Sequence, residues 1–235
     1  MEDSSKPPLQ PGTLYLVATP IGNLEDITLR ALRTLKECDL IAAEDTRHTG
    51  QLLKHFGISK PLLSYFKFNE FKRSEEIIER LRRGEKVALV TDAGTPGISD
   101  PGARVVAAAR AAGLRVEPVP GPCALIAALT ASGLPTDESH FVGFLAHKPG
   151  RRRKQLEALK DVPGTLVIYE SPYRIEKLLA EWQEISPARP IVLARELTKK
   201  FEEFLRGTPA ELLELIRKRS LKGEFVVMIG KESPK

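Results

Sequence analysis

The sequence has few of the residues that build disulfide frameworks and metal sites, and no long apolar run. Its 235 residues include only two cysteines, Cys38 and Cys123, which are too few and too scattered for a disulfide framework or a zinc site. No apolar run approaches the roughly 20 residues that a membrane-spanning helix needs. We therefore expect a soluble protein of the reducing cytoplasm, without bound metal. The polar residues 1–11 lack the apolar core of a signal peptide, and we expect them to be a disordered tail.

The common nucleotide-binding motifs are also missing. The chain contains neither G-x-G-x-x-G nor G-x-x-x-x-G-K-[ST]. The sequence therefore gives little support for a dinucleotide or nucleoside triphosphate site of the common kinds. We find no internal repeat and no low-complexity segment.

Positive charge is in modest excess. The formal net charge is +5 and the sequence pI is about 9.2, which permits nucleic-acid binding without proving it. Two basic clusters, at residues 80–86 and 217–222, fit solvated helix ends, where positive charge is favourable. The third cluster opens a predicted helix, where positive charge is unfavourable, and it consists of Arg151, Arg152, Arg153 and Lys154. We interpret this run as a contact for a phosphate-rich partner, with a solvated helix start as the alternative.

Predicted strands and helices alternate along the chain, which indicates an α/β protein with a largely parallel, layered sheet. The break at residues 133–137 predicts a domain boundary, with one α/β domain at 12–134 and a second at 135–235. The strands expected in the first half lie at 14–18, 40–43, 61–66, 87–90 and 115–119, and those in the second half at 141–145, 165–169, 191–194, 201–205 and 225–229.

Residues 91–102 are the most unusual stretch. Three glycines and two prolines follow a short apolar strand. Glycine allows positive φ and close backbone approach, and the end of a strand is where α/β proteins usually hold a ligand. A tight connection without a ligand is the alternative. Residues 19–23 form a second such loop, for which a ligand role and a simple turn are equally compatible with the pattern.

Other segments carry polar or aromatic side chains. Residues 44–48 place Glu44, Asp45, Arg47 and His48 where a strand turns into a helix; a plain N-cap explains Asp45 but not Arg47 and His48. The aromatic residues 65–71 could stack bases, but we favour a strand end that packs on the core. Glu170 and Arg195 end strands of the second half, and would meet the first half only if the two sheets faced each other across a cleft.

Six motifs occur together and in order across residues 12–230. They resemble the ribosomal RNA small subunit methyltransferase I family, within the tetrapyrrole methylase superfamily. The motifs are Ala18-Thr19-Pro20-Ile21-Gly22-Asn23-Leu24-Glu25-Asp26-Ile27-Thr28, Ala43-Glu44-Asp45-Thr46-Arg47, Asp92-Ala93-Gly94-Thr95-Pro96, Pro120-Gly121-Pro122, Tyr169-Glu170-Ser171 and Leu193-Ala194-Arg195-Glu196-Leu197-Thr198-Lys199.

The resemblance implies a two-lobed class III methyltransferase with a parallel N-terminal and a mixed C-terminal sheet, acting as a homodimer. The implied reaction is 2′-O-methylation of a cytidine ribose in the decoding region of 16S rRNA by S-adenosylmethionine, with free 16S rRNA and the small ribosomal subunit both open as the substrate. Backbone atoms at strand-end loops would hold the cofactor. The matching cofactor residues are Pro20, Gly94, Thr95, Ile98, Cys123, Ala124, Tyr169, Ala194 and Glu224.

The acids Glu44, Asp45 and Glu170 are the candidates for the general base, while Arg47 and Arg195, with Arg151, Arg152 and Arg153, are candidates for RNA phosphates. We expect Asp92 to order its loop rather than to catalyse. The family commonly has a histidine-containing segment before Asn-Glu, but this chain has Tyr65-Phe66-Lys67-Phe68-Asn69-Glu70, so no role of those histidines carries over. A tetrapyrrole methyltransferase and a non-catalytic RNA-binding module are the two rival functions.

Overall fold

Two compact units make up the chain in the computed structural model, which describes residues 8–219 and 222–231. The first unit ends at Cys123 and the second begins at Ala124. The predicted boundary at 134/135 lies one helix later, because the break at 133–137 is a loop inside the second unit. Most of the tail predicted for residues 1–11 lies outside the described residues.

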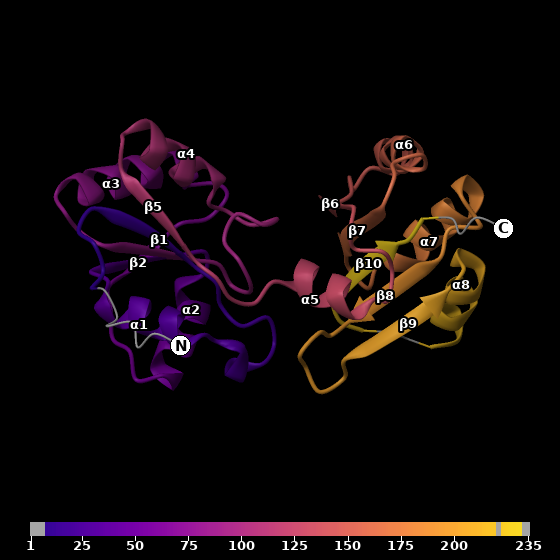
Figure 1. Ribbon diagram of the computed structural model, residues 1–235, viewed down its shortest axis with the longest axis horizontal. Helices are drawn as coiled ribbons and strands as arrows, with labels where there is room; N and C mark the ends of the chain where they lie inside the picture. The colour runs from indigo at the N-terminus through magenta and orange to yellow at the C-terminus, as the bar shows by residue number, and fades with distance from the viewer. Residues whose placement is uncertain (1–7, 220–221, 232–235) are drawn as a thin grey trace. The chain divides into compact units, whose positions relative to one another are not determined.

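The first unit is a parallel sheet between two pairs of helices (Figure 1). Its strand order is β3-β2-β4-β1-β5, with every neighbouring pair parallel. The elements are β1 (Thr13–Val17), the 3₁₀ turn η1 (Leu24–Asp26), α1 (Leu29–Glu37), β2 (Leu40–Ala43), α2 (Thr46–His55), β3 (Leu62–Ser64), α3 (Glu70–Arg82), β4 (Val87–Val90), α4 (Ala103–Ala111) and β5 (Arg115–Val119).

Each face of this sheet buries its own core. Leu35 of α1 and Leu53 of α2 pack on one face with Ile41 of β2. On the other face, Ile77 of α3 and Val105 of α4 pack with Leu89 of β4. A strand buried on both faces has no polar side to present, which is why β2 and β4 are continuous apolar runs.

The second unit is a five-stranded mixed sheet. Its order is β6-β7-β10-β8-β9, with β6 and β7 parallel and the remaining pairs antiparallel. The elements are α5 (Ala124–Ala131), β6 (Ser139–Phe144), α6 (Pro149–Leu159), β7 (Thr165–Glu170), α7 (Ile175–Ile185), β8 (Ile191–Arg195), β9 (Glu203–Gly207), α8 (Pro209–Lys218) and β10 (Phe225–Ile229). These two sheets confirm the predicted α/β architecture.

Helices α6, α7 and α8 supply the helical side of the second core. Leu156, Trp182 and Leu212 contribute one side chain from each helix, packed against strand residues such as Ile168 and Val227. Helix α5 lies against β10. Within the described ranges, no helix has the length and apolar character needed to cross a membrane.

Candidate active site

Strand order identifies one edge of the first sheet as the natural place for a ligand. From β1 the chain runs through α1 toward β2, on one side of the sheet, whereas from β4 it runs through α4 toward β5, on the other side. Because β1 and β4 are neighbours, the chain diverges between them, and such a divergence leaves a crevice beyond the strand ends. The loop at 19–23, here the first loop, and the loop at 91–102, here the glycine loop, flank that point.

The two loops are tied together by backbone hydrogen bonds. The Thr19 amide donates to the Gly94 carbonyl at 2.9 Å, and the Gly94 amide donates back to the Thr19 carbonyl at 3.0 Å. The Thr19 hydroxyl also donates to the Thr91 carbonyl at 3.1 Å. The loops therefore extend the β1–β4 pairing beyond the sheet and hold each other in one conformation.

Glycine is required in this arrangement by backbone angle and by space. Gly94 has φ +85°, and a Cβ there would lie 3.3 Å from the Ile21 side chain. Gly121, in the loop after β5, would place a Cβ 2.9 Å from that of Ala18. The Thr95 hydroxyl donates to the Pro122 carbonyl at 3.0 Å, so the loops after β1, β4 and β5 form one packed assembly.

Several predicted cofactor residues lie in this assembly. Pro20, Thr95 and Ile98 are half-buried, while Gly94 is buried. The Thr91 hydroxyl is buried without a hydrogen-bond partner in the described chain. An orphaned buried hydroxyl is costly, so this group marks a place where a polar ligand atom would be stabilising.

Two acids of the β2–α2 turn meet Asp92 of the glycine loop. The Asp45 amide donates to the Asp92 carboxylate at 3.0 Å, and the Asp92 amide approaches a Glu44 carboxylate oxygen at 3.5 Å. Asp92 thus orders the loop, as expected. Partial burial, followed by the nearby charge of Asp92, raises the pKa of Glu44, which makes that carboxyl a better proton acceptor near neutral pH.

Asp45 has a different environment from Glu44. Its carboxylate accepts from the Arg47 amide at 2.8 Å as the N-cap of α2, and it also binds the Arg47 guanidinium, at 2.7 Å. The hydrogen bonds from Arg47 lower the pKa of Asp45 well below its usual range. A carboxylate held ionised in this way is a weak base, so the geometry favours the N-cap interpretation. Arg47 itself is exposed and remains available for a further anion.

Glu170, at the end of β7, is the most deeply buried acid of the predicted set. Its side chain is 1% exposed; one oxygen accepts from the Ser171 amide at 2.8 Å and lies 3.3 Å from the Arg174 guanidinium. The other oxygen has no hydrogen-bond partner within residues 8–219 and 222–231. Burial raises the pKa of Glu170, opposed by the Ser171 hydrogen bond and by the charges of Arg174 and Arg152. The end of β7 thus carries a buried carboxyl with one oxygen free to accept a proton.

The structure corrects the interpretation of the basic run at the start of α6. The Arg152 side chain is 4% exposed and makes two hydrogen bonds, of 2.8 and 2.6 Å, with Glu181 of α7. A buried, doubly bonded guanidinium is not available to a phosphate, so the assignment of Arg152 to RNA binding is wrong. Arg153 pairs with Glu157 and Glu184 at the surface, and Arg151 is exposed.

Tyr169, beside Glu170 on β7, holds the start of α5. Its hydroxyl accepts from the Leu125 amide at 2.9 Å, one of the donors that a helix leaves free at its N-terminus. Its ring packs edge to face on Phe141 and Phe144. Ala124, another predicted cofactor residue, begins this helix, and Cys123 precedes it as a half-buried free thiol.

The remaining predicted residues lie at the β8 and β10 ends. Ala194 is buried in β8 between Val226 and Phe204. The Arg195 guanidinium binds Glu203 at 3.4 Å and the carbonyls of Phe201 and Lys222, at 3.3 Å each. Glu224 is exposed and pairs with Lys199 at 3.5 Å. Arg195 therefore stabilises the chain segments that follow β8 and precede β10.

Sequence reasoning missed Arg174 and the role of Thr91. Arg174 contacts Glu170 and donates to the carbonyls of Leu145 and Ala146, at 2.9 and 3.1 Å. Glu170 and Arg174 are four positions apart, a spacing that indicates a contact only within a helix. Because Glu170 ends β7 and Arg174 precedes α7, the spacing gave no reason to pair them. The lack of a partner for the buried Thr91 hydroxyl results from packing, and no pattern in the neighbouring sequence indicates it.

Comparison with known proteins shows that the chain is similar to methyltransferases. The family model described as Tetrapyrrole (Corrin/Porphyrin) Methylases matches residues 13–213. The ribosomal RNA small subunit methyltransferase I of Halalkalibacterium halodurans is 50% identical over 218 residues, 93% of this chain and 75% of the relative. That of Xylella fastidiosa is 54% identical over 222 residues, 93% of this chain and 81% of the relative.

Among solved structures, uroporphyrin-III C-methyltransferase from Thermus thermophilus, in complex with S-adenosylhomocysteine, has the same fold. It is 23% identical, with a TM-score of 0.63 over 93% of this chain and 97% of that one.

Proposed function

Because the chain belongs to the ribosomal RNA small subunit methyltransferase I family of tetrapyrrole methylases, we propose that it methylates the 2′-oxygen of a cytidine ribose in the decoding region of 16S rRNA. S-adenosylmethionine is the methyl donor. The observation that carries the proposal is the pairing of the first loop with the glycine loop at the divergence between β1 and β4, beside the orphaned Thr91 hydroxyl.

The first-unit loops fit a cofactor held mainly by backbone. Gly94 leaves open a space that a side chain would fill, and the surrounding loops present Pro20, Thr95 and Ile98 as half-buried surfaces. These residues, with Cys123 and Ala124, would hold S-adenosylmethionine, which supplies an electrophilic methyl group on a sulfonium. The assignments of Tyr169, Ala194 and Glu224 rest on the family resemblance. Recognition through backbone explains why no charged nucleotide motif occurs in the sequence.

Glu170 is our candidate for the general base. A ribose hydroxyl is a weak acid, so a base that removes its proton during transfer contributes on the order of 10²–10⁴-fold. Glu170 has a raised pKa and one oxygen free to accept that proton, whereas Asp45 is held ionised by Arg47. Glu44, whose pKa is also raised, is the second candidate. Alignment of the 2′-oxygen with the methyl group would supply a larger part of the rate, on the order of 7–11 kcal/mol.

Exposed arginines would bind the phosphates of the substrate, which we propose to be 16S rRNA or the small ribosomal subunit. Arg47 and Arg151 are exposed, and Arg153 is exposed although ion-paired. Changing Arg151 and Arg153 to Ser should reduce the salt dependence of RNA binding by about 0.7 in log–log slope for each phosphate that is no longer neutralised. Arg195 could contribute only by leaving Glu203. We further propose that the protein is cytoplasmic and forms a homodimer. Light scattering of the purified protein would test the dimer.

The direct test is transfer of isotopically labelled methyl from S-adenosylmethionine to small ribosomal subunits that lack the modification, followed by nucleotide mapping. We expect label on the ribose of one decoding-region cytidine. Label on a base, or on a different RNA, would overturn the proposed position. Incorporation into a uroporphyrinogen instead of RNA would favour the tetrapyrrole alternative. Cofactor binding without transfer to RNA or tetrapyrrole would contradict both activities.

A further inference from the structure

The aromatic segment at 65–71 has two different environments. Tyr65 is completely buried, and its hydroxyl contacts Glu70 at 3.1 Å and Ser74 at 3.3 Å. The predicted packing of this segment on the core is therefore correct for Tyr65. It is wrong for the three phenylalanines that follow, Phe66, Phe68 and Phe71, all of which are exposed; Phe68 is 87% exposed and Phe71 65%. We call these three residues the aromatic turn.

Asn69 closes the part of the aromatic turn that contains Phe66 and Phe68, whereas Phe71 lies within helix α3. The Asn69 side chain accepts from the Phe66 amide at 2.8 Å and donates to the Ser64 carbonyl at 3.1 Å. Asn69 is also the N-cap residue of α3, yet its side chain makes no capping hydrogen bond to that helix. The rings of Phe66 and Phe68 pack edge to face, 6.2 Å apart. These exposed rings are thus presented on an ordered turn, at little further entropic cost to a ligand that binds them.

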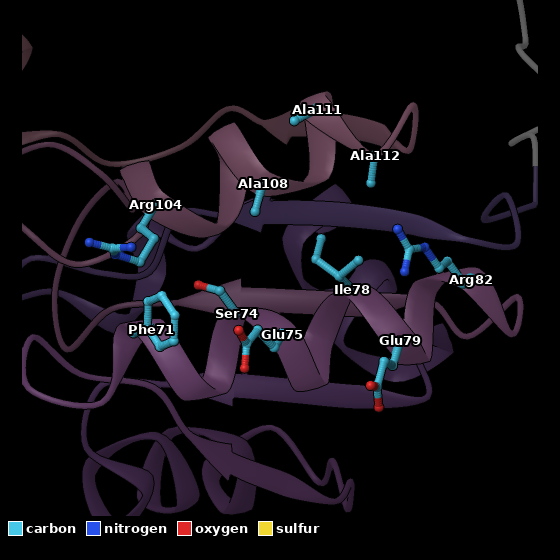
Figure 2. Close-up of a pocket in the computed structure, with 10 residues that line it drawn as sticks. All are labelled: Phe71, Ser74, Glu75, Ile78, Glu79, Arg82, Arg104, Ala108, Ala111 and Ala112. Carbon is cyan, nitrogen blue, oxygen red and sulfur yellow. The ribbon is translucent and has the colours of Figure 1, made fainter.

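Positive charge surrounds the rings. Lys67 and Lys72 flank Phe68 and Phe71 in the sequence and are exposed. Figure 2 shows Arg104 of α4 beside Phe71 of α3, with the guanidinium 5.6 Å from the ring centroid. Within the part of the chain that the structure describes, none of these three cations has a carboxylate within ion-pair distance. Their charge is therefore available to a partner.

A groove of about 580 Å³ runs from this point between α3 and α4. Figure 2 shows the side chains that line it. Glu75 and Glu79 line the groove beyond Phe71, and Arg82 lines its far end. The two carboxylates would repel an anionic chain that entered the groove. The binding surface that we consider is accordingly the basic, aromatic end, at Phe71 and Arg104.

A carboxylate connects the aromatic turn to the glycine loop. Glu70 Oε1 accepts from the Tyr65 hydroxyl and also from the Gly102 amide, the latter at 3.2 Å. Gly102 ends the glycine loop, has φ +145°, and would place a Cβ 3.1 Å from Leu89. The turn after β3 and the loop after β4 are therefore fixed to each other at the same edge of the first sheet.

We propose that the aromatic turn, with Lys67, Lys72 and Arg104, stacks unpaired bases of the RNA substrate while the cations hold the adjacent phosphates. Aromatic side chains beside lysine and arginine are the usual means of binding single-stranded nucleic acid, because every base has a face that can stack. This inference rests on the proposed function, since it assigns the surface to the same RNA. It adds a binding surface next to the cofactor loops, without a role in the chemistry.

The alternative occupant is a second copy of this chain. If the turn packed on itself across a two-fold axis, each copy would bring the same three cations against those of its partner, and the like charges would repel. An anionic partner neutralises them instead. The charge pattern therefore favours RNA.

The experiment measures binding of the full chain to a fluorescein-labelled single-stranded oligouridine by anisotropy, beside an abasic oligomer of the same length and charge. Wild type should prefer the oligouridine. Phe68→Ala and Phe71→Ala should each weaken oligouridine binding about tenfold and leave the abasic affinity and the salt slope unchanged. Phe68→Trp should retain binding, because the ring is kept. The matched control is Phe201→Ala, which removes a phenylalanine of similar exposure, 64%, that also has a lysine beside its ring.

A second variant separates the contribution of charge to RNA binding from that of stacking. Lys67→Gln with Lys72→Gln should lower the salt slope by about 0.7 for each phosphate that is no longer neutralised, and should weaken both oligomers equally.

Three results would overturn the inference. They are wild-type affinity in the phenylalanine variants, equal weakening of abasic-oligomer binding, and a change in oligomeric state of those variants in light scattering, which would assign the turn to a protein interface. Methyl transfer by wild type to small ribosomal subunits keeps the two proposals distinct. Its failure contradicts the proposed function, whereas normal transfer with no effect of Phe68→Ala contradicts only the stacking surface.

Discussion

The two units position groups at their strand ends by different means. In the first unit, backbone hydrogen bonds join the loops after β1 and β4, while the Thr95 hydroxyl and a close contact at Gly121 attach the loop after β5. In the second unit, charged side chains do this work: Glu170 at the end of β7 lies beside Arg174, and Arg152 of α6 is bound to Glu181 of α7.

This difference predicts different sensitivities. A surface built from backbone changes little when polar side chains are replaced, but it is disrupted by an added Cβ. A buried ionic cluster depends on each member, because removing one leaves its partner buried without compensation. Four substitutions test the contrast, in order of decreasing expected effect.

Removal of the Glu170 carboxylate should have the largest effect. Glu170→Gln should slow methyl transfer on the order of 10²–10⁴-fold while leaving S-adenosylmethionine binding unchanged in calorimetry. A general base acts in its ionised form, and burial raises the pKa of Glu170 above the ordinary value of 4.5. The wild-type rate should therefore fall as the pH drops through that raised pKa, and the variant should lack this limb of the pH–rate profile.

Glu44→Gln is the companion to this variant. Loss of the acid limb in Glu44→Gln, with the limb kept in Glu170→Gln, would assign the base to the first unit. An equal loss of cofactor affinity in Glu170→Gln would make Glu170 structural instead.

Two adjacent arginines of α6 test the role of burial. Arg152→Met should destabilise the protein by about 3 kcal/mol in urea unfolding, because it leaves Glu181 without its buried partner. Arg153→Met, which removes an exposed arginine paired with Glu184 of the same helix α7, should change stability little. Equal losses in the two variants would mean that burial of Arg152 does not govern the contribution of its ion pair.

Two glycines with similar backbone angles test the role of the glycine loop. Gly94→Ala and Gly113→Ala each introduce a Cβ at positive φ, +85° and +70°, at a cost of about 1–2 kcal/mol. Only Gly94 has a side chain within 4 Å of that Cβ, namely Ile21, whereas the space at Gly113 is open. S-adenosylmethionine affinity should fall about tenfold in Gly94→Ala alone. A similar fall in Gly113→Ala would attribute the effect to general destabilisation.

The smallest effect is expected at Tyr169, a neutral hydrogen-bonding residue of the second unit. Tyr169→Phe leaves the Leu125 amide without its acceptor and should cost about 1 kcal/mol in unfolding free energy. Tyr173→Phe, which alters an exposed hydroxyl, is the control and should be neutral. A loss in Tyr169→Phe as large as that in Arg152→Met would remove the distinction between neutral and ionic bonds in this unit.

The sequence predicted the parts of the structure that depend on local pattern. The apolar runs of β2 and β4 and the glycines of residues 91–102 carry their conformational preferences in their own residue types, so the sheet and the glycine loop were predictable. The sequence pattern predicted the domain boundary at 133–137, whereas the units divide between Cys123 and Ala124. The difference arises because glycine and proline mark loops within a unit as well as linkers between units.

What could not be predicted depends on distant contacts. Arg152 and Glu181 are separated by 29 positions, and a basic run gives no sign of which member will be buried against an acid. Phe68 and Tyr65 are both aromatic and close in sequence, but one is exposed and the other buried. Only the packing of α3 on the sheet separates them.

The Thr19–Gly94 pair has a consequence for hydrogen exchange. Two amides in loops beyond the sheet are bonded as in an antiparallel ladder, so they should exchange with deuterium as slowly as strand amides. In the glycine loop, Gly94 would then show the protection of a strand amide, whereas the Ile98 and Gly102 amides are bonded only within the loop or to a side chain. Loss of that protection would report opening of the first loop and the glycine loop before any unfolding of the sheet, and would allow their local stability to be measured without a ligand.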